Sequence, residues 1–234
     1  MALQRDNKLD LIRGIAAFLV ISGHTFQVYG GYADNPLYNF ITAIQMPLFM
    51  MVSGYAVGFS SPIGGGISFY KFVKKRTLSL MLPWLVWSIL AYLILSRAPA
   101  IDYIKTTAFH MEAAFWFLFS LWTIHLIFAL SSLICYKLKG NIRIISILIL
   151  CGVFDACLML VGLKLGMTFL GIKYTTYYLV FYLIGWILNL YITKQPEWTK
   201  KTWSGIAFMT LTVFFVVMLS KYSIVSRYCS KKCV

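Results

Sequence analysis

The chain has 234 residues, of which 60% are hydrophobic and 12% are charged, and its formal net charge is +14. This hydrophobic content exceeds the roughly 45–50% typical of a soluble globular domain, so we predict an all-α integral membrane protein, a polytopic helix bundle. The Lys and Arg residues lie mostly between apolar stretches and form no single basic face, so no nucleic-acid partner is expected.

About seven stretches are long and apolar enough to cross the ~30 Å hydrocarbon layer of a bilayer. They lie approximately at 10–29, 38–59, 78–95, 114–136, 142–163, 174–193 and 203–220. The first is too long for a cleaved signal peptide and has no small-residue cleavage site after it, so we expect it to be retained. The connections are short, so we expect no soluble domain and interpret residues 1–234 as one transmembrane domain.

The basic residues follow the positive-inside rule if the N-terminus is cytoplasmic. Twelve then lie inside, namely Arg5, Lys8, Lys71, Lys74, Lys75, Arg76, Lys137, Lys139, Arg143, Lys194, Lys200 and Lys201, and four lie outside, namely Arg97, Lys105, Lys164 and Lys173. The tail is the exception, because a seventh span would place outside Lys221, Arg227, Lys231 and Lys232. Either a span is miscounted or the chain stops where its full-length relatives continue.

The connection before the third predicted span has two parts. Residues 60–68, "SSPIGGGIS", have the composition of a flexible linker, and residues 69–84, "FYKFVKKRTLSLMLPW", form a basic stretch leading into the span. Such a stretch typically lies on the cytoplasmic membrane face, attracted to anionic headgroups. Five cysteines are present, but their spacing predicts neither a disulfide framework nor a metal site.

The first predicted span contains polar residues on one helical face. Asp10 and Arg13 are three residues apart and can pair, and His24 follows Arg13 by eleven residues, close to three full turns and a rise of roughly 16 Å. Two interpretations stay open. In the first, the Arg13 side chain extends to the lipid headgroups and His24 forms a hydrogen bond with a neighbouring helix. In the second, Asp10, Arg13 and His24 line an elongated functional pocket, since polar groups in membrane spans are costly and often functional.

Three other spans contain candidates with a structural alternative. Ser53 and Gly54 either line a substrate path or let helices approach closely, and packing is the commoner use of small residues. His125 lies among aromatic residues, where a single histidine is more often structural. Asp155 in the fifth span requires a partner or a cavity, and the sequence does not identify that partner.

Four segments in order carry a family resemblance. In this order they resemble segments of the membrane-bound acyltransferase family 3. The segments are "RGIAAFLVISGH" in the first span, "MPLFMMVSGY" in the second, "FVKKRTLSLMLPWLVW" before and within the third and "FWFLFSLW" in the fourth. The resemblance is strongest over residues 5–125. Members commonly O-acetylate surface polysaccharides and other exported glycans, so it implies an O-acyltransferase of a bacterial inner membrane. No bound cofactor is implied; an acyl-CoA, by family habit acetyl-CoA, is the cytoplasmic co-substrate and a carbohydrate hydroxyl is the acceptor.

The resemblance also implies roles for particular residues. Arg13 and His24 match the family's catalytic pair in the first span, and a neutral imidazole can take a proton from a sugar hydroxyl at ordinary pH. The guanidinium of Arg13 would hold a phosphate of CoA or orient the donor. Asp10 and Ser53 are expected beside the substrates.

A second family motif carries two arginines separated by two residues. Arg76 matches one of them, Ser79 occupies the other position, and Lys74 and Lys75 are expected to supply the missing charge. Lys75 and Arg76 are therefore predicted substrate-binding residues.

Two other functions stay open. A transporter or flippase of a lipid-linked glycan would also use a polar stripe and an intramembrane acid. An inactive, C-terminally truncated remnant is the third possibility, because the family usually has about ten spans and this chain ends in "SRYCSKKCV".

Overall fold

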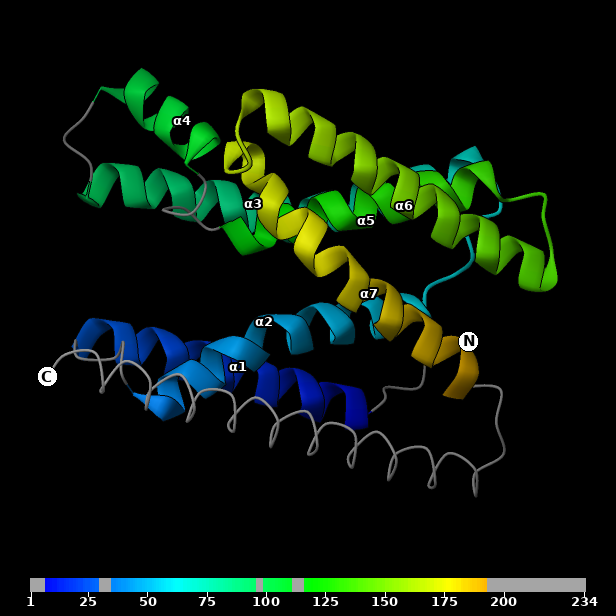
Figure 1. The fold of residues 1–234 in the computed structure, drawn as a ribbon, viewed down its shortest axis with the longest axis horizontal. Coiled ribbons are helices and arrows are strands. Elements are labelled where there is room, and N and C mark those ends of the chain that lie inside the picture. Colours follow the sequence, from blue (N-terminus) through cyan, green and yellow to red (C-terminus); the bar gives the residue numbers. More distant parts are fainter. Residues whose placement is uncertain (1–6, 30–34, 96–98, 111–115, 193–234) are drawn as a thin grey trace, which may run out of the picture. The chain divides into compact units, whose positions relative to one another are not determined.

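A computed structural model describes residues 7–29, 35–95, 99–110 and 116–192, and all the regular structure in those segments is helical (Figure 1). The α-helices are α1 (Asn7–Tyr29), α2 (Pro36–Val57), α3 (Gly66–Leu95), α4 (Ala100–Phe109), α5 (Trp116–Ile134), α6 (Gly140–Leu165) and α7 (Ile172–Ile192). A short 3-10 helix, η2 (Phe169–Gly171), leads directly into α7.

Within the described residues, 6 helical segments are long and apolar enough to cross a membrane, which confirms the predicted fold class. They are Leu9–Gln27, Pro36–Val57, Gly66–Ile94, Trp116–Ile134, Gly140–Leu165 and Phe169–Ile192. Each overlaps one of the first six predicted stretches. The seventh predicted stretch, 203–220, lies outside the described residues.

The third span differs most from its prediction. Helix α3 has 30 residues and begins at Gly66, so the basic stretch belongs to the same helix as the apolar segment. At about 1.5 Å per residue α3 is about 45 Å long, enough for the whole bilayer with its headgroup regions. Lys71, Lys74 and Lys75 are exposed on its first turns. The linker ends near Gly64, whose N–H donates to the Ser68 hydroxyl at 2.9 Å.

The described residues divide into two compact units, those up to residue 46 together with 187–192 and those of 47–186, which are described separately. In the second unit α5 is the core helix, packed against α3 and α6. Its buried residues are Ser120, Leu121, Ile124, His125, Ile127, Phe128, Ala129, Ser131 and Ser132. By contrast, α6 exposes most of its apolar side chains, as a helix surrounded by lipid would.

Helices α2 and α7 approach closely in the second unit through two glycines. A Cβ at Gly54 would overlap the backbone carbonyl of Tyr182, and a Cβ at Gly185 would overlap the carbonyl of Met51. Such small residues let helix backbones meet in membranes. The packing interpretation of Gly54 is therefore supported.

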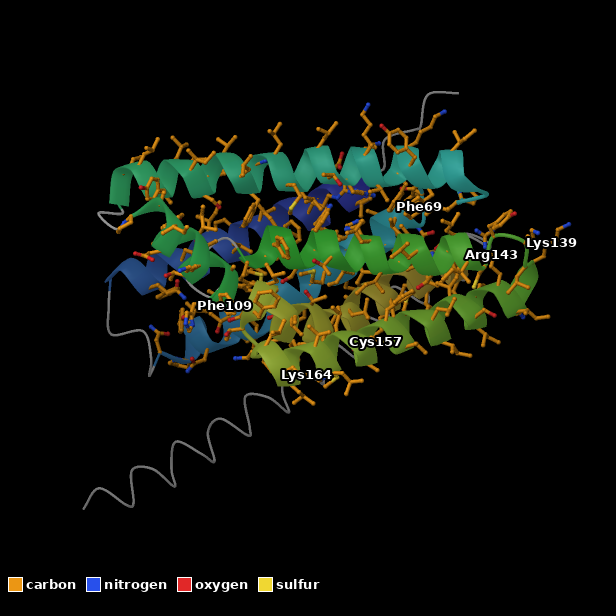
Figure 2. All side chains as sticks on the ribbon, turned by 90° about the horizontal axis from the view of Figure 1, so that it is seen from above. Phe69, Phe109, Lys139, Arg143, Cys157 and Lys164 are labelled. Carbon is orange, nitrogen blue, oxygen red and sulfur yellow. The ribbon has the colours of Figure 1, made fainter. Side chains whose placement is uncertain are left out.

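Basic residues gather at one end of the second unit. The Arg143 guanidinium donates to the Ile63 carbonyl at 2.8 Å, which joins the start of α6 to the connection before α3. Figure 2 shows Phe69, Lys139 and Arg143 at this end and Phe109 and Lys164 toward the other.

Candidate active site

Asp10 and Arg13 pair on the first turns of α1, as predicted. The Arg13 Nη1 atom lies 3.5 Å from Asp10 Oδ1, and the exposed fractions of the two side chains are 47% and 34%. Asp10 also lies in the first turn, where a carboxylate is favourable beside the positive end of the helix dipole. An exposed pair of this kind contributes little stability, so its position matters more than its strength.

His24 belongs to a hydrogen-bonded chain that links α1 to the start of α2. Its Nδ1 atom lies 3.1 Å from Gln27 Oε1, and the Gln27 amide nitrogen donates to the Tyr38 hydroxyl at 2.9 Å. Because this nitrogen faces Tyr38, the amide oxygen faces His24, and an amide oxygen only accepts. In the neutral ring Nδ1 therefore carries the hydrogen, and Nε2 keeps the lone pair that a general base needs.

A second contact holds α1 against α2 next to His24. A Cβ at Gly23 would overlap the side-chain amide of Gln45, which is 7% exposed. The rings of Phe26 and Tyr38 also meet edge to face, with centroids 6.2 Å apart. The residues on both sides of His24 thus fix this part of α1.

The Ser53 hydroxyl has a local role in α2. It donates to the Phe49 carbonyl at 2.8 Å, the usual bond of a helical serine to the preceding turn. The side chain is half-buried. Its assignment to a substrate path stays a prediction.

Arg76 and Lys75 differ in environment although they are adjacent. Arg76 is half-buried with its guanidinium 5.3 Å from the centre of the Phe72 ring, whereas Lys75 is exposed. Ser79, at the other position of the motif, turns its hydroxyl to the Arg76 carbonyl at 3.2 Å. The charge available here thus comes from Arg76 and neighbouring lysines.

His125 is part of the aromatic core of the second unit. It is 2% exposed, and Nδ1 donates to the Leu121 carbonyl at 2.8 Å. Its ring centroid lies 6.0 Å from that of Phe72 and 5.2 Å from that of Tyr182. These contacts favour the structural interpretation.

Asp155 remains without an assigned partner. Its Oδ1 atom is buried and has no hydrogen-bond partner among the described residues. Those residues also contain no group of three His, Cys, Asp or Glu side chains that could hold a metal ion.

The predicted site residues are divided between the two units. Asp10, Arg13 and His24 lie in the first, and Ser53, Lys75 and Arg76 lie in the second. Within α1, Arg13 and His24 share a face but are about 16 Å apart along the axis, so they serve different parts of a site.

Sequence reasoning missed Gln27 and Tyr38. Gln27 is three residues after His24, a spacing that places two side chains on one helical face and could have identified it. Tyr38 belongs to another helix, and no pattern in the sequence joins it to His24.

Comparison with known proteins agrees with the four motifs. Residues 6–225 match the acyltransferase domain of acyltransferase family 3. The nodulation protein NolL of Mesorhizobium japonicum is 37% identical over 97 residues, 39% of this chain and 25% of that protein. NolL of Sinorhizobium fredii is 30% identical over 167 residues, 64% of this chain and 41% of that protein.

The chain therefore spans less than half the length of these relatives. No solved structure matches it. The domain match nevertheless covers nearly the whole sequence, from before α1 to beyond α7. The chain belongs to the membrane-bound acyltransferase family 3.

Proposed function

We propose that this protein is an integral membrane O-acyltransferase that moves an acetyl group from acetyl-CoA to a hydroxyl of a cell-surface or exported carbohydrate. The observation that carries the proposal is the family match over residues 6–225, within which the Nδ1 atom of His24 lies 3.1 Å from Gln27 Oε1. The transporter alternative gains no support of its own from the described residues.

His24 acts as the general base in this proposal. Its Nε2 atom takes the proton of the acceptor hydroxyl as the oxygen attacks the thioester carbonyl. The new C–O bond forms, the C–S bond breaks, and the departing sulfur takes the proton from the imidazolium. Gln27 accepts the Nδ1–H bond throughout, which stabilises the imidazolium and holds the ring in position.

Arg13 contacts the donor, and Arg76 with Lys75 adds positive charge for it. The phosphates of CoA are strong hydrogen-bond acceptors, and a guanidinium can bind them with a planar pair of donors. Arg13 is nearly half exposed beside Asp10, so its charge is available to a ligand. Lys75 is exposed one position before Arg76.

The donor side is the cytoplasm in this proposal, and the protein lies in a bacterial inner membrane with a cytoplasmic N-terminus. Support comes from the second unit, where α3 begins with exposed lysines and the start of α6 lies at the same end. Those are the positions that the positive-inside rule assigns to the cytoplasm.

The test uses membranes that contain the protein, radiolabelled acetyl-CoA and glycans extracted from the host envelope. We expect label on the glycan with the wild type and not with His24→Gln at equal membrane levels. A gene deletion should change the acetyl content of surface glycans and leave their amount unchanged. Loss of glycan amount with unchanged acetylation would instead identify a flippase and overturn the proposal.

A further inference from the structure

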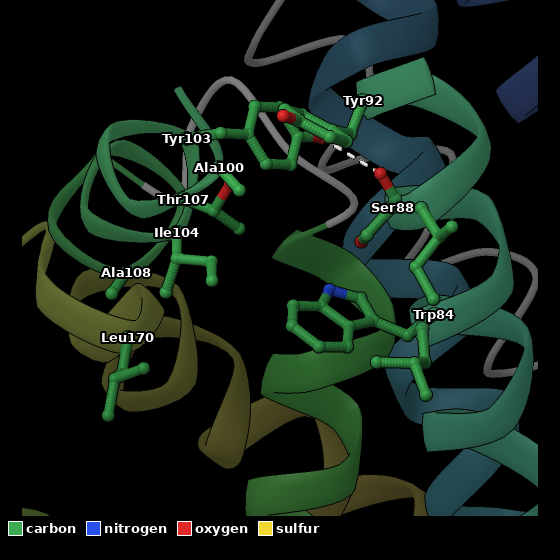
Figure 3. Close-up of a pocket in the computed structure, with 11 residues that line it drawn as sticks. Trp84, Ser88, Tyr92, Ala100, Tyr103, Ile104, Thr107, Ala108 and Leu170 are labelled. Atoms are coloured by element: carbon green, nitrogen blue, oxygen red, sulfur yellow. Dashed lines mark hydrogen bonds between the residues drawn. The ribbon is translucent and has the colours of Figure 1, made fainter. Parts of the chain in front are cut away.

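A cavity of about 330 Å³ lies within the second unit, between the last turns of α3, helix α4 and η2 (Figure 3). Its walls are almost entirely carbon. The residues that carry the argument are Trp84 and Ser88 from α3, Tyr103, Ile104 and Ala108 from α4, and Leu170 from η2. Figure 3 shows Trp84 and Ser88 facing Ile104, Ala108 and Leu170 across it. The volume is in the range of small-molecule sites.

The cavity exists because α4 is attached at two separate points. The Tyr103 hydroxyl donates to the Ser88 carbonyl at 3.1 Å, and the Tyr103 and Tyr92 rings lie 5.0 Å apart. At its other end α4 meets η2 through Phe109 and Phe169, whose ring centroids are 5.1 Å apart. Between these contacts α4 stands away from α3 and leaves the space open.

The surroundings of the cavity are apolar and exposed. Leu85 and Ile89 of α3 are each 49% exposed and Ile104 of α4 is 65% exposed, and all three also line the cavity. In a membrane such side chains contact lipid. A ligand can therefore enter from the bilayer, and its main part must be hydrocarbon, because polar groups would be left without partners.

Two polar atoms of the α3 wall lack partners. Trp84 Nε1 and Ser88 Oγ are both buried and make no hydrogen bond to any described residue. The indole N–H is only a donor and the hydroxyl can donate, so the wall can accommodate one oxygen acceptor. Ser88 lies seven residues before the end of α3, which is about 10 Å along the helix axis. Because α3 is long enough for the bilayer with its headgroup regions, this position is close to the boundary between headgroups and hydrocarbon. Tyr92 and Tyr103 mark the same level, as aromatic residues at a membrane interface do.

We propose that this cavity binds one acyl chain of a membrane diacyl lipid, with the ester carbonyl bonded by Trp84 and Ser88. Hydrocarbon walls match the chain, the unpartnered atoms match the carbonyl, and their level in the bilayer matches the depth at which lipid esters lie. The proposal does not depend on acyl transfer.

The test uses the full chain in nanodiscs that contain a trace of diacyl phosphatidylglycerol with a photoactivatable group in one chain. Cross-linked residues are mapped by mass spectrometry without acetyl-CoA or acceptor. We expect the cross-links to concentrate on the cavity walls. Ala108→Phe should lower them about tenfold, equivalent to about 1.4 kcal/mol of binding. The matched control Thr106→Phe, on the opposite and exposed face of α4, should leave them unchanged.

A second comparison tests the carbonyl. The ether-linked form of the same lipid has no carbonyl, so its cross-linking should be about threefold to tenfold lower. The double variant Trp84→Phe, Ser88→Ala should abolish that difference and keep the chain-binding signal. Even labelling of all lipid-facing helices, unchanged labelling in Ala108→Phe, or equal labelling by ester and ether lipids would each overturn the proposal.

Discussion

The Oε1 atom of Gln27 lies 3.1 Å from Nδ1 of His24, and the same amide donates to Tyr38 at 2.9 Å. The amide presents its nitrogen to Tyr38 and its oxygen to the histidine. Since an amide oxygen only accepts, Nδ1 carries the hydrogen of the neutral ring in this arrangement, and Nε2 is left as the proton acceptor.

Gln27→Ala should lower the rate of acyl transfer about threefold to tenfold, because it removes one hydrogen bond of ~0.5–1.5 kcal/mol that orients the ring. Gln27→Glu keeps an acceptor for Nδ1–H and should retain more activity. The rate is measured with radiolabelled acetyl-CoA at saturating donor. Equal rates for wild type and Gln27→Ala would show that the ring needs no such orientation.

His24→Ala should lower acyl transfer by about 10²–10⁴-fold while the protein stays inserted and abundant, because the general base is lost. His24→Gln keeps a polar side chain but cannot accept the proton, so it should be nearly as poor. A packing histidine would tolerate glutamine, since an interhelical hydrogen bond contributes only ~0.6–2 kcal/mol. Near-normal transfer in the glutamine variant at equal membrane levels would rule out the base assignment.

Arg13→Ala should raise the KM for acetyl-CoA about tenfold or more, because a charge-assisted bond to a phosphate is lost. Arg76→Ala should have a milder effect, because lysines neighbour it. Lys105→Ala, on α4, provides a control that removes an exposed positive charge elsewhere. An unchanged affinity of the Arg13 variant for acyl-CoA would exclude the donor contact.

The spans were largely predictable because crossing a membrane is a property of length and composition. Apolar runs located α1, α2, α5, α6 and α7. The start of α3 was missed, because its first turns are basic and a search for apolar runs begins only where they end. Helix α4 was missed for a similar reason, since its ten residues are too few to form a span.

The site was only partly predictable, because its geometry depends on contacts between helices. The spacing of Asp10 and Arg13 was sufficient to predict their pair, since both belong to one helix. The bond from Gln27 to Tyr38 joins two consecutive helices, and the meeting of Gly54 with Tyr182 joins two helices that are distant in sequence. Those contacts depend on packing, which a single sequence does not encode as a local pattern.

The orientation can be tested with single cysteines in a cysteine-free background. Lys74→Cys should resist a membrane-impermeant thiol reagent in intact cells, because the positive-inside rule places the start of α3 in the cytoplasm. Thr106→Cys, on the exposed face of α4, should be labelled. Both should react in permeabilised cells. Ready labelling of position 74 from outside would reverse the topology and the side from which the donor enters.

Gly54→Ala should destabilise the protein because a methyl group there would overlap the carbonyl of Tyr182, a backbone atom that cannot rotate away. The expected loss is about 1–3 kcal/mol, as for other overpacked contacts. Gly152→Ala is the matched control, because Gly152 is an exposed residue of α6 with no atom within 4 Å of its added Cβ. Since alanine favours a helix over glycine by roughly 0.5–1 kcal/mol, that variant should be neutral or slightly more stable. The measurement is thermal unfolding of the purified protein in detergent. A lower midpoint for Gly54→Ala alone would confirm the close crossing of α2 and α7, whereas equal midpoints for both variants would show that the helices separate there at little cost.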